Sequence, residues 1–220
     1  MPQLNPATER PMNVSTPVLD AALLTRIAEL NRDYLDLLAR EYATPAVAAQ
    51  LQYFPASVAR ALAALEPSAR RDLAGAPFAL YSLSLDNERL WRAPVDVEAD
   101  SLEQRYGHRG QAWLQGPFCE AALVQAWHLA LCSGLAARIV YAMSEEAVRR
   151  LAATPLWRLK RIVNEHPAVL SPRWPTNPAF WPDLVRFAAV ADSRRLRATL
   201  LLGCCLTAAE LECPSERRRR

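Results

Sequence analysis

The stretch Leu135–Leu151, which reads LAARIVYAMSEEAVRRL, decides the fold of this chain. It predicts one short helix, a break at Ser144 and a second short helix. Serine is a preferred N-cap residue, because its hydroxyl can accept a hydrogen bond from a free amide of the first turn. Glu145 and Glu146 follow in that turn, where negative charge interacts favourably with the helix dipole. We therefore expect two helices joined at a serine-capped break.

The segments on either side of this stretch extend it into a larger unit. A helix is predicted from about Pro117 to Cys132, and another begins at Thr154–Pro155 with Leu156, Leu159, Ile162 and Val163 inward. An extended segment is expected at Val169–Trp174. The unit built around Trp127 to Arg173 is therefore mainly helical.

The first half of the chain has a similar layout. A long amphipathic helix is predicted from Val18 to Tyr42, and the partial alternation of Phe78–Leu85 indicates an extended segment. Near the C-terminus, Asp192 or Ser193 caps a last helix whose Leu200–Leu206 core is apolar on all sides. That pattern is typical of a central, buried helix.

The two halves agree at several positions when they are set against each other at a constant offset. This predicts an all-α fold of two related multi-helix units, packed as an intramolecular pseudo-dimer, with short extended segments. The two long helices should then cross and bury their apolar stripes in one core. The matched positions are Ala48 with Ala137, Leu51 with Val140, Phe54 with Met143, Arg60 with Arg149, Leu62 with Leu151, Leu73 with Ile162, Leu80 with Val169, and Trp91 with Phe180.

Composition sets the predicted boundaries between these units. Prolines and charged residues separate the helices, and two close glycines beside charges indicate a loop between the halves. The predicted organisation is a disordered N-terminus at 1–16, a first helical unit at 17–95, a linker at 96–113, a second helical unit at 114–212 and a basic tail at 213–220.

Charge and cysteine content favour a cytoplasmic protein. The net charge is +3, carried almost wholly by arginine, since Lys160 is the only lysine. The five cysteines follow no disulfide or zinc spacing, so reduced and mostly buried thiols are expected. The polar start of the chain does not resemble a signal peptide, and its longest apolar run is shorter than the roughly 20 residues that span a bilayer.

The sequence contains no recognisable catalytic, cofactor or metal motif. The three histidines, His108, His128 and His166, form no metal-spaced pair, and glycine-rich phosphate loops and nucleophile elbows are missing. The acidic residues are scattered over helix faces and form no acid–base pair. We therefore expect a protein without catalytic residues, metal or cofactor, which acts by binding.

The second half resembles the family of the flagellar transcriptional regulator FlhD. The resemblance implies an all-α protein that dimerises and binds a second regulator, in which the partner carries most of the DNA contact and a cysteine-bound zinc. In the first half, Ile27–Leu35 is similar to that family's opening helix. The residues that carry the resemblance in the second half are Ala126–Leu129, Ala136–Arg138, Met143–Glu146, Leu151–Leu156, Val169–Trp174 and Leu196–Leu206.

The resemblance favours a bacterial regulator of transcription that works through another protein, with direct nucleic-acid binding weak or absent when the chain is alone. A tandem chain would supply the dimer by itself, so a monomer is expected. An alternative function is a helical adaptor of a bacterial type III secretion apparatus.

Two groups of residues are candidates for contact with a partner. Trp174, Phe180 and Trp181 lie in a proline-rich segment and form either part of the core or a docking patch of the kind that tryptophan dominates. The tail Arg217, Arg218, Arg219 and Arg220 is either a solvated end or an electrostatic contact with nucleic acid or an acidic partner.

Overall fold

A computed structural model describes residues 18–48, 51, 53–88, 91, 109–165 and 169–212. This part of the chain is predominantly helical, with one two-residue antiparallel ladder, so the all-α prediction is confirmed. The elements are α1 (Ala21–Ala43), α2 (Pro45–Ala48), α3 (Ala56–Ala63), α4 (Pro67–Ala74), β1 (Tyr81–Ser82), α7 (Arg109–Cys132), α8 (Gly134–Tyr141), α9 (Glu145–Ala152), α10 (Leu156–Glu165), β2 (Ser171–Pro172), α11 (Phe180–Ala189) and α12 (Ser193–Glu212).

Side-chain caps begin several of the helices, including the two that flank the predicted break. Ser144 Oγ accepts a hydrogen bond from Ala147 N at 3.1 Å, which confirms the capped break between α8 and α9. Ser133 caps α8 in the same way. The cap of α1 is Asp20, whose Oδ1 accepts from Leu23 N at 2.7 Å, so this helix begins slightly later than its apolar pattern suggested.

The helix α7 is longer than predicted. It begins at Arg109 and passes through Pro117, so residues 109–113 are helical and the predicted linker at 96–113 ends too late. Proline normally forces the preceding residue out of the helical region through a clash with its Cβ. Here that residue is Gly116, which has no Cβ, and the helix continues.

The helices of the two halves recur with nearly one offset. Adding 89 to the bounds of α3, 56–63, gives 145–152, which are the bounds of α9. The same shift takes α1, 21–43, to 110–132, within one residue of α7, and the start of α4 at 67 to the start of α10 at 156. The neighbours recur as well, because α1 packs on α2, α3 and α4 as α7 packs on α8, α9 and α10.

The ladder lies between the two halves at equivalent positions. Ser82 of β1 pairs with Ser171 of β2, and these residues are 89 apart. After the strands the offset between equivalent positions becomes 90. Ser84 and Trp174 have positive φ values of 48° and 49°. Asn87 N donates to Ser84 O and Asn177 N donates to Trp174 O, both at 3.0 Å. The chain therefore turns in the same way after each strand.

The segments that follow the two strands cross over to the opposite half. The helix α11 packs on α3 and α4 of the first half. In the other direction, Leu85 O and Trp91 O each accept a hydrogen bond at 2.9 Å, from Arg150 of α9 and Arg158 of α10. The Ser144 hydroxyl also donates to Asp86 Oδ1 at 2.6 Å. Each half is therefore completed by the other.

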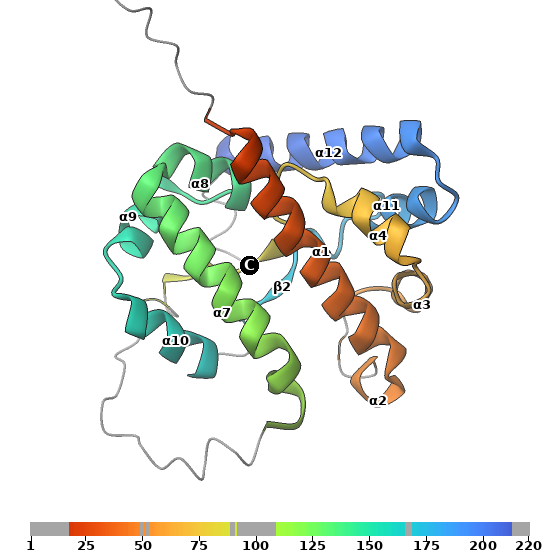
Figure 1. Ribbon diagram of the computed structural model, residues 1–220, viewed down its shortest axis with the longest axis horizontal. Helices are drawn as coiled ribbons and strands as arrows, with labels where there is room; N and C mark the ends of the chain where they lie inside the picture. Colours follow the sequence, from red (N-terminus) through yellow and green to blue (C-terminus); the bar gives the residue numbers. More distant parts are fainter. Residues whose placement is uncertain are drawn as a thin grey trace, which may run out of the picture.

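One continuous core lies behind α1 and α7 and joins the two halves (Figure 1). Around the ladder, the Tyr81 ring lies 5.3 Å from Tyr34 of α1 and 5.1 Å from Phe118 of α7, measured between centroids. A second aromatic group, further towards α11 and α12, contains Phe54, Phe78, Trp174, Phe180 and Trp181.

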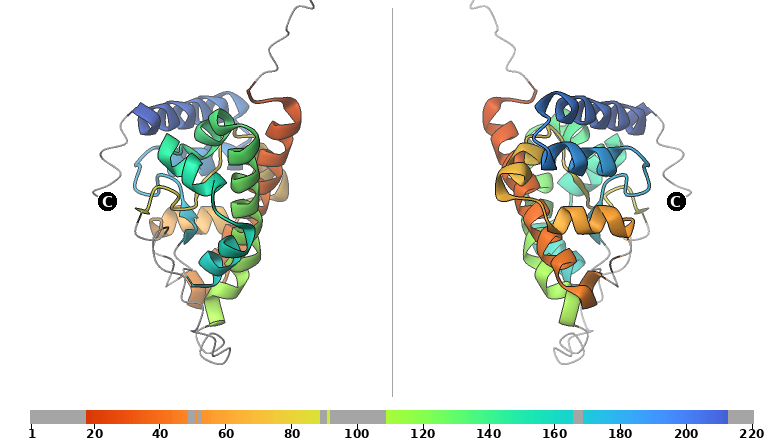
Figure 2. Two further views of the ribbon diagram at one scale, coloured as in Figure 1. Left: turned by 90° about the vertical axis from the view of Figure 1, so that its left-hand side faces the viewer. Right: turned by 90° about the vertical axis from the view of Figure 1, so that its right-hand side faces the viewer.

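The helix α12 lies at the edge of the molecule, where the two side views place it across the top (Figure 2). The prediction of a central, buried helix is therefore wrong. Its buried stripe is Leu196, Thr199, Gly203 and Thr207, while Leu201 is 66% exposed. Small side chains let this helix approach the aromatic group closely, and its larger leucines lie beside or away from the contact.

Gly203 is the point of closest approach, and replacing it with alanine is expected to destabilise the protein. A Cβ at this position would lie 2.2 Å from Phe78 Cζ and 2.9 Å from Phe180 Cε2. Overpacking of this kind costs about 1–3 kcal/mol, and the better helix propensity of alanine offsets about 1 kcal/mol of it. The measurement is the midpoint of urea unfolding, which should fall for Gly203→Ala.

Gly75→Ala is the matched control for this substitution. The φ of Gly75 is −67°, and an added Cβ would meet Asp72 O at an ordinary 3.4 Å. Its unfolding midpoint should stay level or rise slightly, because alanine restricts the unfolded chain. Equal midpoints for the two variants would contradict the close approach of α12.

Several predictions concern residues outside the described part of the chain. These are the disordered N-terminus at 1–16, most of the linker at 96–113, and the tail at 213–220 with Arg217 to Arg220. Among the described residues, none of the helices combines the length and the apolar character that crossing a membrane requires.

Candidate protein-binding surface

The proline-rich segment Pro172–Pro182 belongs to the core more than to the surface. Phe180 and Trp181 are both 0% exposed, and Trp174 is half-buried. Phe180 packs edge-on against Trp174 at 4.8 Å and against Trp181 at 5.7 Å between centroids. Of the two interpretations of this cluster, core packing holds for Phe180 and Trp181. The interpretation of these two rings as a docking patch is wrong.

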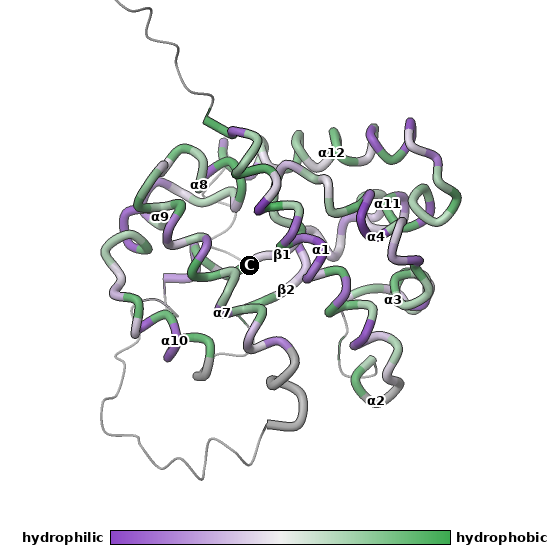
Figure 3. Tube along the Cα trace, in the orientation of Figure 1, coloured by the Kyte–Doolittle hydropathy of each residue, from purple (hydrophilic) through white to green (hydrophobic). Residues whose placement is uncertain are grey.

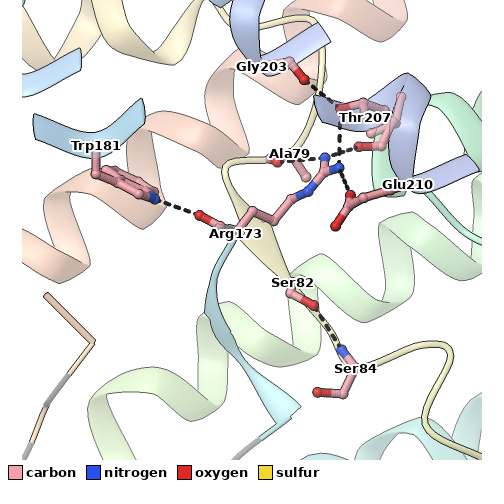
Figure 4. Close-up of polar contacts among 9 residues, drawn as sticks. Ala79, Ser82, Ser84, Arg173, Trp181, Gly203, Thr207 and Glu210 are labelled. Atoms are coloured by element: carbon pink, nitrogen blue, oxygen red, sulfur yellow. Dashed lines mark hydrogen bonds and ion pairs between the residues drawn. The ribbon is translucent and has the colours of Figure 1, made fainter. Parts of the chain in front are cut away.

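Arg173 is the polar centre of this segment (Figure 4). Its side chain is 4% exposed. The guanidinium donates to Ala79 O at 3.2 Å, to Val140 O at 3.4 Å and to Thr207 Oγ1 at 3.1 Å, and it forms an ion pair with Glu210 Oε2 at 2.6 Å. One side chain thus connects the segment before β1, the end of α8 and the last turns of α12.

The backbone of Arg173 is held as firmly as its side chain. Its N–H donates to Leu80 O at 3.0 Å, and its carbonyl accepts from Trp181 Nε1 at 2.6 Å. The Trp174 ring lies 4.1 Å from the guanidinium carbon, close enough for a cation–π interaction. The position of Arg173 in the fold is therefore structural, and it fixes the orientation of α12.

A groove lies between the equivalent helices α1 and α7, which lie side by side at the front of the molecule in Figure 1. Its volume is about 640 Å³. Leu30, Ala121 and Val124 supply apolar surface, and charged groups flank them. The lining residues are Arg26, Glu29, Leu30, Asp33, Pro117, Glu120, Ala121, Val124 and Gln125.

The outer face of α10 lies on the other side of α7 and is linked to this groove by one ion pair. Lys160 Nζ of α10 lies 3.2 Å from Glu120 Oε1, a residue that lines the groove. One turn earlier on α10, Leu156 is 46% exposed and Trp157 is 57% exposed. We call the groove together with Leu156, Trp157 and Lys160 the α1/α7/α10 face.

Leu156 was expected to point inward, and its exposure shows that this expectation is wrong. Leu159 and Ile162 are buried, but Leu156 lies at the first turn, beyond the surface that α7 covers. Trp157 was missed as a candidate. A signal for it was present, because on a helical wheel position 157 lies on the side of the helix opposite Leu159 and Ile162.

Burial raises the pKa of two thiols and of one carboxyl group. Burial raises the pKa of Cys119 to about 12, and burial together with the neighbouring Cys205 raises the pKa of Cys204. These thiols stay protonated at neutral pH and are weak nucleophiles. Burial also raises the pKa of Glu41, partly opposed by a hydrogen bond from Gln115.

The cysteines are less buried than expected. Cys119 is buried and Cys204 is partly buried, but Cys132 and Cys205 are exposed, and all four are free thiols. Cys213 lies outside the described residues. Within the described ranges, no three or more histidine, cysteine, aspartate or glutamate side chains are grouped so that they could hold a metal ion.

Among the described residues, polar groups such as Arg173 are enclosed in the core, while large apolar side chains remain at the surface, on α7, α8, α10 and α12 and at the end of α11. The first hold the fold together, and the second are suited to contact with other macromolecules. No protein-family model matches this chain, and comparison with curated proteins and with solved structures gives no significant match.

Proposed function

We propose that this chain is a regulatory protein that acts by binding another protein through the α1/α7/α10 face. The resemblance of its second half to the FlhD family supports a role in bacterial transcription regulation. In this proposal the chain works in the cytoplasm and carries no catalytic group, and the partner makes the principal contact with nucleic acid.

The observation that carries the proposal is the exposure of Trp157 at 57%, next to Leu156 at 46%. Tryptophan is enriched among the few residues that dominate the energy of protein interfaces. A second regulator could place an apolar side chain against Leu30 and Val124, while charged residues of the groove set its orientation.

The recurrence of elements supports a fused pair of related units. The bounds of α3 and α9 differ by 89 residues, and so do the paired residues Ser82 and Ser171. Where a related regulator would build a two-fold scaffold from two chains, this protein would build it from one chain with internal pseudo-symmetry. The α1/α7 groove would then lie between equivalent helices.

The test is loss of partner binding when Trp157 is replaced by serine. Wild-type protein is used to recover partners from the bacterium that encodes it, and the affinity for the purified partner is then measured by calorimetry. Trp157→Ser should weaken binding at least tenfold, as expected for truncation of a hot-spot side chain. A gel-shift titration across salt concentrations shows whether the chain and partner together bind DNA.

Val190→Ser is the matched control, because Val190 is 68% exposed at the end of α11 and lies outside the proposed face. Its binding should equal that of the wild type. Unchanged binding by Trp157→Ser would contradict the proposed face. Recovery of components of an export apparatus, without a DNA-linked regulator, would instead favour the secretion adaptor.

A further inference from the structure

The outward face of α12 is uncharged over its middle turns. From Ala198 to Ala209 the sequence ATLLLGCCLTAA contains no charged residue. Along the Cα trace, the middle of the helix is largely coloured as hydrophobic (Figure 3). Because the buried stripe contains Thr199, Gly203 and Thr207, larger apolar side chains such as that of Leu201 point away from the core.

Six exposed residues of α12 form a regular stripe. They recur at alternating intervals of four and three, the spacing that places residues along one seam between two paired helices. All six are exposed, and they are Arg194, Ala198, Leu201, Cys205, Ala208 and Glu212.

This stripe is self-complementary about Gly203. If a second α12 lies antiparallel to the first, with the two-fold axis beside residue 203, position 194 faces 212, position 198 faces 208, and position 201 faces 205. Arginine then faces glutamate at both ends, alanine faces alanine, and leucine faces cysteine. Facing alanines let two helices approach closely, so the leucine and cysteine side chains can fill the space between them.

The terminal charges of α12 run against its helix dipole. Arg194 lies in the first turn, where the partial charge is positive, and Glu212 lies at the end, where it is negative. Each charge therefore disfavours the isolated helix by a small amount. An antiparallel neighbour reverses the sign of that interaction, because it brings Glu212 of one chain to Arg194 of the other.

We propose that two copies of this chain associate through α12, packed antiparallel about a two-fold axis at Gly203. The contact is isologous, since the same stripe serves both copies and the assembly closes as a dimer. It uses none of the helices α1, α3, α4, α7, α9 and α10, which recur between the two halves. The dimer replaces the monomer expected from the sequence and does not depend on the partner-binding proposal.

The first test is sedimentation velocity of the full chain under reducing conditions, over a range of protein concentrations. The wild type should approach twice the 24.5 kDa mass of one chain as the concentration rises. Leu201→Glu should remain a monomer at every concentration at which the wild type is a dimer. Since Leu201 is 66% exposed, this variant should keep the wild-type circular dichroism spectrum, and it should keep the wild-type unfolding midpoint at concentrations low enough for the wild type to be monomeric.

The second test exploits the charges and is specific for the antiparallel arrangement. Arg194→Glu puts glutamate opposite Glu212, and Glu212→Arg puts arginine opposite Arg194. Each variant alone should dimerise several-fold more weakly than the wild type. An equimolar mixture of the two should recover the wild-type dimer affinity, because every facing pair in the mixed dimer is again opposite in charge.

Specific results would overturn the proposal. A wild-type chain that is monomeric at all concentrations would exclude the proposed dimer. This holds both if a segment of the same chain covers α12 and if a different protein covers it. A dimer that survives Leu201→Glu would place the contact elsewhere. If both charge variants weaken the dimer and their mixture does not recover it, the helices do not pair antiparallel.

Discussion

Replacing Arg173 with methionine is expected to cost about 3–5 kcal/mol of unfolding free energy, the range found when one partner of a buried ion pair is removed. Methionine keeps much of the aliphatic volume but donates no hydrogen bond. The substitution would remove the donors that now reach Ala79 O, Val140 O and Thr207 Oγ1 within 3.1–3.4 Å, while Val140 O would keep its hydrogen bond from Ala79 N at 3.0 Å. The measurement is the unfolding free energy from urea titration.

Two further variants separate the contributions around Arg173. Arg173→Lys retains the charge but cannot reach partners in three elements at once, so it should recover only part of the lost stability. Glu210→Gln should cost much less than Arg173→Met, because the Glu210 side chain is 31% exposed and water can solvate the changed group. If Arg173→Met changed stability by no more than Glu210→Gln, the enclosed guanidinium would not be the centre of this network.

The second large effect is expected at Asn31, which is 0% exposed on α1. Its Nδ2 donates to Phe78 O at 2.9 Å and more weakly to Ala74 O and Ala76 O, at 3.4 and 3.3 Å, while its Oδ1 accepts from Leu80 N at 2.9 Å. One planar amide thus satisfies both kinds of backbone group in the segment that leads into β1. Asn31→Asp keeps the shape but replaces the donors with a carboxylate that faces carbonyl oxygens.

Asn31→Asp should therefore lose about 3 kcal/mol or more at neutral pH, because an unpaired buried charge is costly. Burial raises the pKa of such a carboxyl group in the folded state. The folded form then binds a proton that the unfolded form has released, so stability is partly retained at acid pH and is lost as the pH rises. Thermal unfolding of variant and wild type from pH 4 to 8 checks this, and a pH-independent difference would contradict it.

Local chemistry explains why the helices could be predicted from the sequence. The Ser144 cap, the acidic first turn of α9 and the proline at the start of α4 each act within about four residues, so the pattern alone reveals them. The offset of 89 positions between α3 and α9 equals the offset at which the two halves of the sequence agree. After the strands the offset is 90, so Trp91 corresponds to Trp181 and not to Phe180. The indole N–H groups of both tryptophans donate to the turn before them.

Contacts that are distant in the sequence explain what could not be predicted. Arg173 lies between Pro172 and Trp174 and would ordinarily be placed at the surface, but its partners are 33 to 94 residues away. Gly203 gave no sign that two phenylalanine rings lie against it. The leucines of α12 suggested burial, although apart from Leu196 the side that enters the core is formed by the smaller residues Thr199, Gly203 and Thr207.

The sequence left two interpretations open for Trp174, Phe180 and Trp181, core packing or an exposed docking patch. The structure supports the first, because the aromatic rings pack on one another and on α3. Periodicity assigns a side chain to one side of a helix, but it does not say where the neighbouring helix ends. That limit is why Leu156 was expected inside and Trp157 was overlooked.

The packing of α11 on the first half has a consequence for folding during synthesis on the ribosome. When residue 91 has been synthesised, α3 and α4 still lack α11, which is about ninety residues from being made, and Tyr81 lacks the strand that pairs with it. The nascent first half therefore exposes apolar surface that it cannot cover by itself. Chaperones that shield emerging chains would protect this interval, and the final structure would form in one late, concerted step once α11 and α12 have left the exit tunnel.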